Sequence, residues 1–146
     1  YENLGGRFRE VAGAGLDAVR VSRGLATGDF DGDGDRDLVI VASNGLAEVY
    51  ENLGGSAAGG WLAVDLRGRG GNRFGIGARL ELETPGREGS QVREVVTGSS
   101  YLSQSELAAH FGLGAAESAT LTVRWPSGRV QRVRDLAADR RVVAYE

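Results

Sequence analysis

The segment from Asp29 to Asp37 constrains the fold of this chain more than any other part of the sequence. It reads Asp-Phe-Asp-Gly-Asp-Gly-Asp-Arg-Asp, so carboxylates occupy every second position. Like charges at this spacing repel, and each close pair costs on the order of 1 kcal/mol even in a watery dielectric. A cation that prefers oxygen ligands would turn this repulsion into attraction, and the segment therefore predicts a metal-binding loop.

Calcium is the cation that fits this pattern, because it accepts about six to eight oxygen ligands in flexible geometry. Alternate positions of such a loop converge on one point, and Gly34 supplies the sharp turn. The ninth position closes the site. The expected ligands are the side chains of Asp29, Asp31, Asp33 and Asp37 and the backbone carbonyl of Asp35.

The flanks show that the loop is not an EF-hand. An EF-hand has a bidentate Glu at its twelfth position, where this chain has Ile40. Residues 38–42 read Leu-Val-Ile-Val-Ala, a β-branched run typical of a buried strand, and residues 24–28 do not resemble a helix either. We therefore expect a calcium site between two strands. The alternative is an acidic, solvated hairpin loop.

Composition favours an all-β class. The chain has 146 residues, which suffices for one core or two small ones, with 24 Gly and only two Pro. It has no Cys, and all 17 basic residues are Arg. Met is also absent, so Tyr1 is not a natural translation start, and we expect the C-terminal piece of a longer protein. No signal peptide or membrane span is expected within it.

Charge and a small-residue stretch divide the chain into two units. Residues 1–60 carry a net charge of −5 and residues 61–146 a net charge of +2. The change coincides with Ser-Ala-Ala-Gly-Gly at residues 56–60, a composition typical of linkers. We predict a first unit at 1–55, a linker at 56–60 and a second unit at 61–146.

An internal repeat indicates the architecture of the first unit. The hexapeptide Tyr-Glu-Asn-Leu-Gly-Gly at residues 1–6 recurs at residues 50–55, a period of 49 residues. Such periods are typical of propeller blades with four short strands. The expected strands are 7–11, 24–29, 38–42 and 47–52. A propeller needs about four to eight blades, so we expect a partial β-propeller blade, covered by missing blades and marginal unless docked on residues 61–146.

The first unit resembles an FG-GAP/VCBS repeat. The residues that carry the resemblance are Tyr-x-Asn-x-Gly, Phe-x-x-Val and Gly-Asp-Phe-Asp-Gly-Asp-Gly-x-x-Asp-Leu, within about residues 1–55. That family forms integrin-like β-propellers with calcium in the Asp-rich loop. The resemblance implies side-chain ligands at Asp29, Asp31, Asp33 and Asp37 and a main-chain ligand at Asp35.

The second unit is predicted to be a small antiparallel β-sandwich-like domain. In residues 80–83 and 121–125 apolar and polar residues alternate, as a half-buried antiparallel strand requires. Residues 125–128, Trp-Pro-Ser-Gly, indicate a hairpin turn between two strands. The expected strands are 61–67, 78–83, 91–97, 108–111, 119–125, 130–134 and 141–145.

The second unit also resembles the ASPIC/UnbV domain, which follows FG-GAP-type repeats in the cartilage acidic protein-like family. Five motifs carry the resemblance: residues 61–68, 72–79, 98–104, 110–114 and 123–128. The family commonly has Asp where this chain has Phe74, a departure that bears on a local turn or polar contact. The resemblance implies no defined biochemical activity.

Other chemistry in the second unit is weakly supported. The single histidine, His110, lies downstream of several serines, but no Gly-x-Ser-x-Gly elbow is present. We therefore expect His110 to make a hydrogen bond in a strand or turn. Gly75 and Gly77 lack the third glycine of a dinucleotide fingerprint and indicate a tight turn. No Cys/His cluster exists for zinc.

The arginines raise one further hypothesis. Those of the second unit could bind an anionic glycan or, less readily, RNA or DNA. A net charge of only +2 and the absence of interleaved aromatic residues argue against nucleic acid. The simpler interpretation pairs these arginines with glutamates on solvated strand faces.

Together these observations predict a calcium-binding, non-catalytic scaffold or adhesion module with an unknown protein or glycan ligand. Structural calcium favours an extracellular or periplasmic location, since extracellular sites have modest affinity and calcium is plentiful there. Two alternatives remain open: the accessory C-terminal part of a larger propeller enzyme, and an anionic glycan-binding module.

Overall fold

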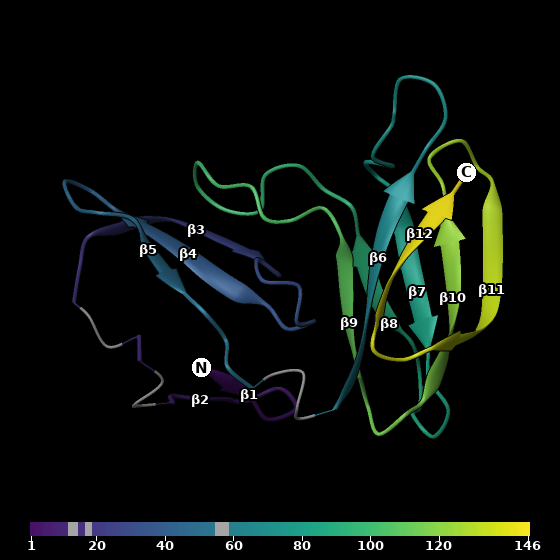
Figure 1. Ribbon diagram of the computed structural model, residues 1–146, viewed down its shortest axis with the longest axis horizontal. Coiled ribbons are helices and arrows are strands. Elements are labelled where there is room, and N and C mark those ends of the chain that lie inside the picture. The colour runs from purple at the N-terminus through teal and green to yellow at the C-terminus, as the bar shows by residue number, and fades with distance from the viewer. Residues whose placement is uncertain (12–14, 17–18, 55–58) are drawn as a thin grey trace.

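The computed structural model describes residues 1–11, 15–16, 19–54 and 59–146. Strands are the regular elements of these residues, with no helix among them, which confirms the predicted all-β class. Figure 1 shows a two-layered unit containing the C-terminus beside a smaller unit containing the N-terminus. Gly60 already belongs to a strand, and residues 56–58 of the expected linker lie outside the described residues.

The second unit is a sandwich of two sheets. One sheet has the order β12-β6-β9, and the other has the order β11-β10-β7-β8. Figure 1 shows the two layers face to face. The strands are β6 (Gly60–Arg67), β7 (Arg79–Glu83), β8 (Gln91–Glu94), β9 (Ala109–Gly114), β10 (Ser118–Arg124), β11 (Val130–Ala137) and β12 (Arg140–Tyr145).

Alternating side chains from both layers form the core. Leu62 and Val64 of β6 and Phe111 of β9 face Leu80 of β7 and Leu121 of β10, and all five are at most 1% exposed. Burying one such side chain contributes about 1.5–3 kcal/mol. The predicted alternation at residues 80–83 and 121–125 therefore serves to fill the space between the sheets.

One strand pairing differs from the antiparallel arrangement that we predicted. Strand β12 runs parallel to β6, from Arg140 opposite Leu62 to Tyr145 opposite Arg67. The reason is the connection: β12 follows β11 of the other sheet after a turn that contains Asp139 at φ 57°. The crossing between layers, rather than a hairpin with β6, sets its direction.

Two turns of the sandwich occur where the sequence predicts them. The amide of Trp125 donates to the Arg129 carbonyl at 2.9 Å, which closes the hairpin between β10 and β11. Gly75 and Gly77 have φ 62° and 83°. Asn72 exchanges two 2.9 Å hydrogen bonds with the backbone of Ile76, so this turn is closed without Phe74, which is half exposed.

The first unit contains an antiparallel sheet of order β3-β4-β5 and a separate hairpin, β1-β2. The strands are β1 (Glu2–Asn3), β2 (Phe8–Arg9), β3 (Ser22–Gly28), β4 (Asp37–Ala42) and β5 (Glu48–Tyr50). Our assignment of residues 7–11 to the same four-stranded blade is therefore wrong. Strand β2 pairs instead with β1, in a local hairpin that places Phe8 opposite Asn3 and Arg9 opposite Glu2.

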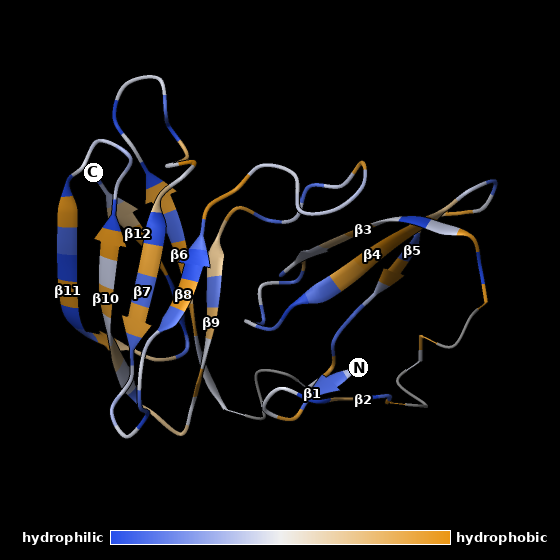
Figure 2. Ribbon diagram, turned by 180° about the vertical axis from the view of Figure 1, so that it is seen from behind, coloured by the Kyte–Doolittle hydropathy of each residue, from blue (hydrophilic) through white to orange (hydrophobic). Residues whose placement is uncertain are grey.

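The first unit has little core of its own. The buried hydrophobic residues of the described chain all lie between Leu62 and Trp125. Figure 2 shows β4 as a hydrophobic strand outside the sandwich. Its apolar side chains at residues 38–42 are at most partly buried, and Val41 is 41% exposed, so the prediction of a buried strand is wrong: no second layer covers the sheet within the described residues.

This difference in packing predicts a difference in local stability. In native-state hydrogen exchange we expect the amides of β3, β4 and β5 to open at a lower free energy than those of β6, β7 and β10. Exchange protection follows the buried apolar contacts of each segment. Equal protection of the two sets, measured on the same sample by mass spectrometry, would contradict this expectation.

No helix in the described part of the chain is long and apolar enough to cross a membrane.

Candidate metal centre

The Asp-rich segment is the loop that joins two neighbouring antiparallel strands. Strand β3 ends at Gly28 and β4 begins at Asp37, and these two residues are paired opposite each other. The pairing brings Asp29 and Asp37, the first and ninth positions of the loop, to the same end of the sheet. The expected strand-loop-strand arrangement is therefore present.

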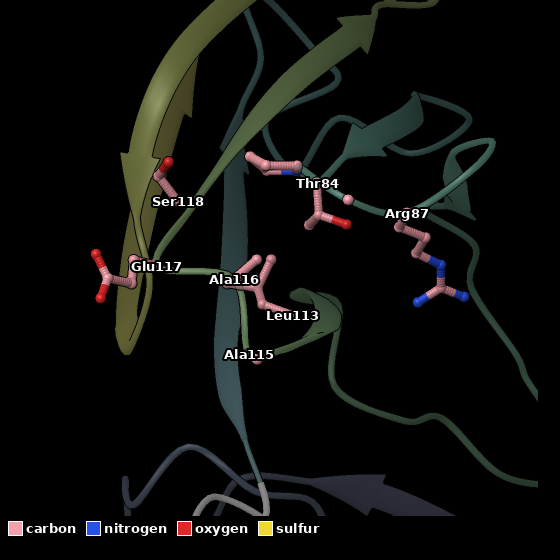
Figure 3. Close-up of a pocket in the computed structure, with 9 residues that line it drawn as sticks. Thr84, Arg87, Leu113, Ala115, Ala116, Glu117 and Ser118 are labelled. Atoms are coloured by element: carbon pink, nitrogen blue, oxygen red, sulfur yellow. The ribbon is translucent and has the colours of Figure 1, made fainter.

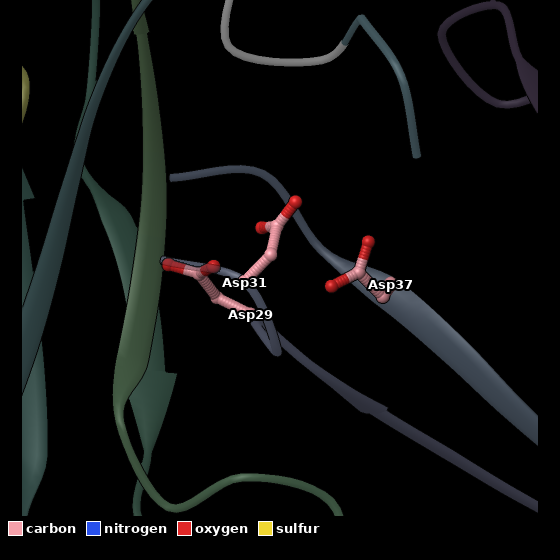
Figure 4. A group of neighbouring side chains, drawn as sticks. All are labelled: Asp29, Asp31 and Asp37. Atoms are coloured by element: carbon pink, nitrogen blue, oxygen red, sulfur yellow. The ribbon is translucent and has the colours of Figure 1, made fainter. Parts of the chain in front are cut away.

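Three carboxylates of the loop converge. Asp29, Asp31 and Asp37 each offer an oxygen, and these oxygens all lie within 4.8 Å of one another. Figure 4 shows Asp29 and Asp31 on one side of the site and Asp37 on the other. Calcium–oxygen distances are about 2.3–2.6 Å, so two oxygens on one ion are at most about 5 Å apart. The spacing accommodates one ion between the three side chains.

The other two expected ligands lie outside this group. The exposed Asp33 accepts a hydrogen bond from the backbone amide of Asp35 at 2.9 Å. The side chain of Asp35 is buried, and its expected contribution is a backbone carbonyl. The ligand roles of Asp33 and Asp35 remain predictions.

Hydrogen bonds within the loop keep it in a turned shape. The Asp29 Oδ1 atom accepts from the amide of Gly32 at 2.7 Å, and the Asp31 Oδ1 atom accepts from the amide of Asp33 at 3.2 Å. Gly32 and Gly34 have φ 82° and 94°, in the left-handed region that favours glycine. The turn expected at Gly34 is present.

Asp37 anchors the site. Its side chain is 2% exposed, and its two oxygens accept hydrogen bonds from the amides of Phe30 at 2.8 Å and Asn52 at 2.9 Å. The carboxylate thereby joins the start of the loop to the segment after β5. The amide of Asn52, which belongs to the repeated hexapeptide, is a partner that sequence reasoning missed.

The Asp-rich loop has an excess of negative charge, which favours a bound cation. Arg36 is the basic residue between Asp29 and Asp37, and its guanidinium donates to the carbonyl of Thr27 at 3.1 Å and to the hydroxyl of the same residue. The donor set consists of oxygen atoms, which suits a hard ion such as calcium rather than zinc. The residues present therefore fit the metal predicted from the sequence.

Residues of the sandwich also contact this loop, and sequence analysis did not find them. Nε2 of His110 in β9 donates to the Gly34 carbonyl at 2.6 Å. Trp61 of β6 stacks on His110, with ring centroids 6.0 Å apart and an interplanar angle of 8°. The sequence predicted a hydrogen bond for His110 in a strand or turn, but its partner is 76 positions away and no local pattern marks it.

A pocket on the surface of the sandwich is a second candidate site. Figure 3 shows this pocket, of about 640 Å³, between the segment after β7 and the turn that joins β9 to β10. Its described lining contains two charged side chains, Arg87 and Glu117. The three-carboxylate group of the Asp loop is the stronger candidate.

Comparison with known proteins agrees with both resemblances. Residues 23–59 match the FG-GAP repeat, and residues 68–146 match the ASPIC and UnbV family. Cartilage acidic protein 1 of Xenopus tropicalis is 38% identical over 109 residues, which are 73% of this chain and 16% of that protein. The proteins of the same name from Mus musculus and Homo sapiens are each 37% identical over 113 residues, 76% of this chain and 17% of theirs. The chain thus spans a small part of the length of these relatives. It belongs to the ASPIC and UnbV family, with an FG-GAP repeat preceding its ASPIC and UnbV domain.

Proposed function

We propose that this chain is a calcium-stabilised, non-catalytic module of an extracellular or periplasmic scaffold or adhesion protein. The observation that carries the proposal is the convergence of Asp29, Asp31 and Asp37 in the strand-joining loop of an FG-GAP repeat. Bound calcium would offset two of the three negative charges on these carboxylates and link the ends of β3 and β4. Its role is therefore structural.

In an exported protein a weak calcium site is sufficient. Calcium sites of extracellular modules have dissociation constants of about 10⁻⁴–10⁻³ M. A site of this strength would be filled outside the cell and empty in the cytosol. The curated relatives carry cartilage in their name, which also supports an extracellular setting.

Further propeller blades of the same protein are the proposed partners of the first unit. Its exposed apolar side chains include Phe8, Leu16, Val49 and Leu53, with between 45% and 85% of their surface accessible. Leu16 and Leu53 line one hollow, and exposed apolar side chains that lie together mark an interaction site. The chain matches only 16–17% of the length of its relatives, which leaves ample sequence for such blades.

The chemistry of the described residues supports a scaffold over an enzyme. The Nε2 atom of His110 is engaged by the Gly34 carbonyl and its ring is stacked on Trp61. Several arginines of the sandwich pair with carboxylates on other strands of the same sheet, such as Arg132 with Glu83 at 2.7 Å and Arg124 with Glu81 at 3.5 Å. These pairs favour solvated strand faces over a glycan-binding patch.

Calcium titration of the 146-residue chain tests the proposal. We expect calorimetry to show one site, and saturating calcium to raise the melting temperature by roughly 5–10 °C over chelator, as filling a site to about 100 times its dissociation constant stabilises by about 2.7 kcal/mol. The Asp31→Ala/Asp33→Ala variant should lose both effects.

Glu10→Gln is the matched control, since it removes a negative charge from an exposed residue of the same unit. It should bind calcium as the parent does. No binding heat and no shift in the parent chain would contradict the proposed function.

A further inference from the structure

The loop Ser99–Glu106 of the sandwich lies along the free edge of β3. The amide of Leu25 donates to the Ser103 hydroxyl at 3.1 Å, and the amide of Thr27 donates to the Ser105 hydroxyl at 3.2 Å. The Glu106 amide in turn donates to the Thr27 carbonyl at 2.9 Å. Figure 1 shows this loop, between β8 and β9, reaching from the sandwich toward β3. It satisfies backbone groups that an unpaired edge would leave open.

A second contact falls on the middle of the Asp-rich loop. Trp61 and His110 form a stacked pair, and His110 binds the Gly34 carbonyl. A Cβ atom added at Gly34 would lie 1.9 Å from Cε2 of Trp61, so the indole packs directly on the backbone of this glycine. Hydrogen bonds of 3.2 and 2.8 Å to Asp139 hold the backbone of Trp61 in place.

A third contact falls on the first ligand position. The Glu106 Oε2 atom accepts from the amide of Asp29 at 3.3 Å, and its Oε1 atom lies 2.6 Å from the Arg141 guanidinium. Arg141 also binds Asp65 of β6 at 2.6 and 3.2 Å. The hydrogen bond to Asp65 raises the pKa of Arg141 above its ordinary value.

The second and third contacts hold the Asp-rich loop at Gly34 and at Asp29. Both contacts come from the sandwich, which is a different unit of the chain. We propose that the sandwich, which contains the ASPIC and UnbV match, is part of the calcium site: Trp61, His110 and Glu106 are positioning residues that hold the Asp-rich loop in its binding shape. Calcium binding and docking of the two units are then one coupled equilibrium. By linkage, each strengthens the other by the same factor. This inference rests on the proposed calcium function.

The test measures calcium affinity in variants that leave every carboxylate of the loop in place. His110→Ala removes the hydrogen bond to the Gly34 carbonyl. Ser105→Ala removes the hydrogen bond to the Thr27 amide and makes no change in the Asp-rich loop. We expect each to weaken calcium binding by about 5-fold or more, the lower end of typical coupling. His110→Gln, which retains a donor for the Gly34 carbonyl, should recover part of the loss. Gln91→Ala is the control, because the Gln91 side chain donates to Gly112 within the sandwich.

Two further readouts separate coupling from general damage. Calcium should slow hydrogen exchange at the Glu106 amide, which lies in the sandwich and bonds to β3, and should not do so in Asp31→Ala. Terbium placed in the site should luminesce when Trp61 is excited, and Trp61→Phe should lose this signal.

The outcomes are distinct. The inference is supported if His110→Ala and Ser105→Ala both bind calcium more weakly and if calcium slows hydrogen exchange at the Glu106 amide. Normal calcium affinity in His110→Ala and Ser105→Ala, beside normal binding by the parent, overturns the inference and leaves the calcium function intact. Absence of binding by the parent overturns both.

Discussion

Replacing Asp37 with alanine is expected to abolish calcium binding and to destabilise the protein even without calcium. Asp37 is one of the three converging carboxylates, and it is the one that is buried. Its loss also leaves the amides of Phe30 and Asn52 without their acceptor. Hydrogen bonds to charged groups contribute about 1.5–3 kcal/mol each. Relief of repulsion from the neighbouring carboxylates offsets part of this, on the order of 1 kcal/mol per pair.

The measurement is the free energy of unfolding in chelator and in excess calcium, by denaturant titration. In chelator we expect Asp37→Ala to lose about 1–3 kcal/mol. Asp31→Ala is the matched control: its carboxylate is exposed and accepts a hydrogen bond only within the loop. It should lose calcium binding as well, yet change stability in chelator by less than about 0.5 kcal/mol. Equal effects of the two variants in chelator would show that Asp37 has no anchoring role.

Replacing Phe111 with alanine is expected to cause the largest loss of stability. Its side chain lies between the two sheets and is fully buried. The guanidinium of Arg93 also lies 5.4 Å from the ring centroid, and this contact would be lost. Truncation of a buried Phe to Ala costs about 3–5 kcal/mol through lost burial and the cavity left behind.

The matched control is Phe8→Ala in the first unit. Phe8 is 71% exposed, so the same truncation should change the free energy of unfolding by less than about 0.5 kcal/mol. Denaturant unfolding followed by circular dichroism compares the two variants. A loss below about 1 kcal/mol for Phe111→Ala would contradict a single core between the sheets.

The loop and the sandwich were accessible to sequence analysis because their signals are local. Alternating carboxylates around Gly34 and alternating apolar residues at 80–83 and 121–125 report local geometry: ligands converge when a loop turns, and one face of a strand is buried. The turn from Trp125 to Gly128 is also indicated by its local sequence. All of these features are present in the structure.

The errors arose where a choice depends on distant parts of the chain. A strand at residues 141–145 is predicted from the sequence, but the parallel pairing of β12 with β6 follows from how the chain crosses between layers. The hydrophobic run of β4 was correct as a strand and wrong as a buried one, because burial requires a covering layer. The pairing of β2 with β1 is a different case, because this hairpin is local: Asn3 pairs with Phe8, and the Leu4 amide donates to the Arg7 carbonyl at 2.7 Å.

Sequence by itself thus determined the all-β class, the sandwich, the position of the Asp-rich loop and the family of the chain. Only the tertiary structure decided that Asp29, Asp31 and Asp37 form the converging group, and that Trp61, His110 and Glu106 contact this loop from the sandwich. The physical reason is range. Turn and strand preferences act over a few residues, whereas a hydrogen bond between His110 and Gly34 exists only after two separate sheets have packed side by side.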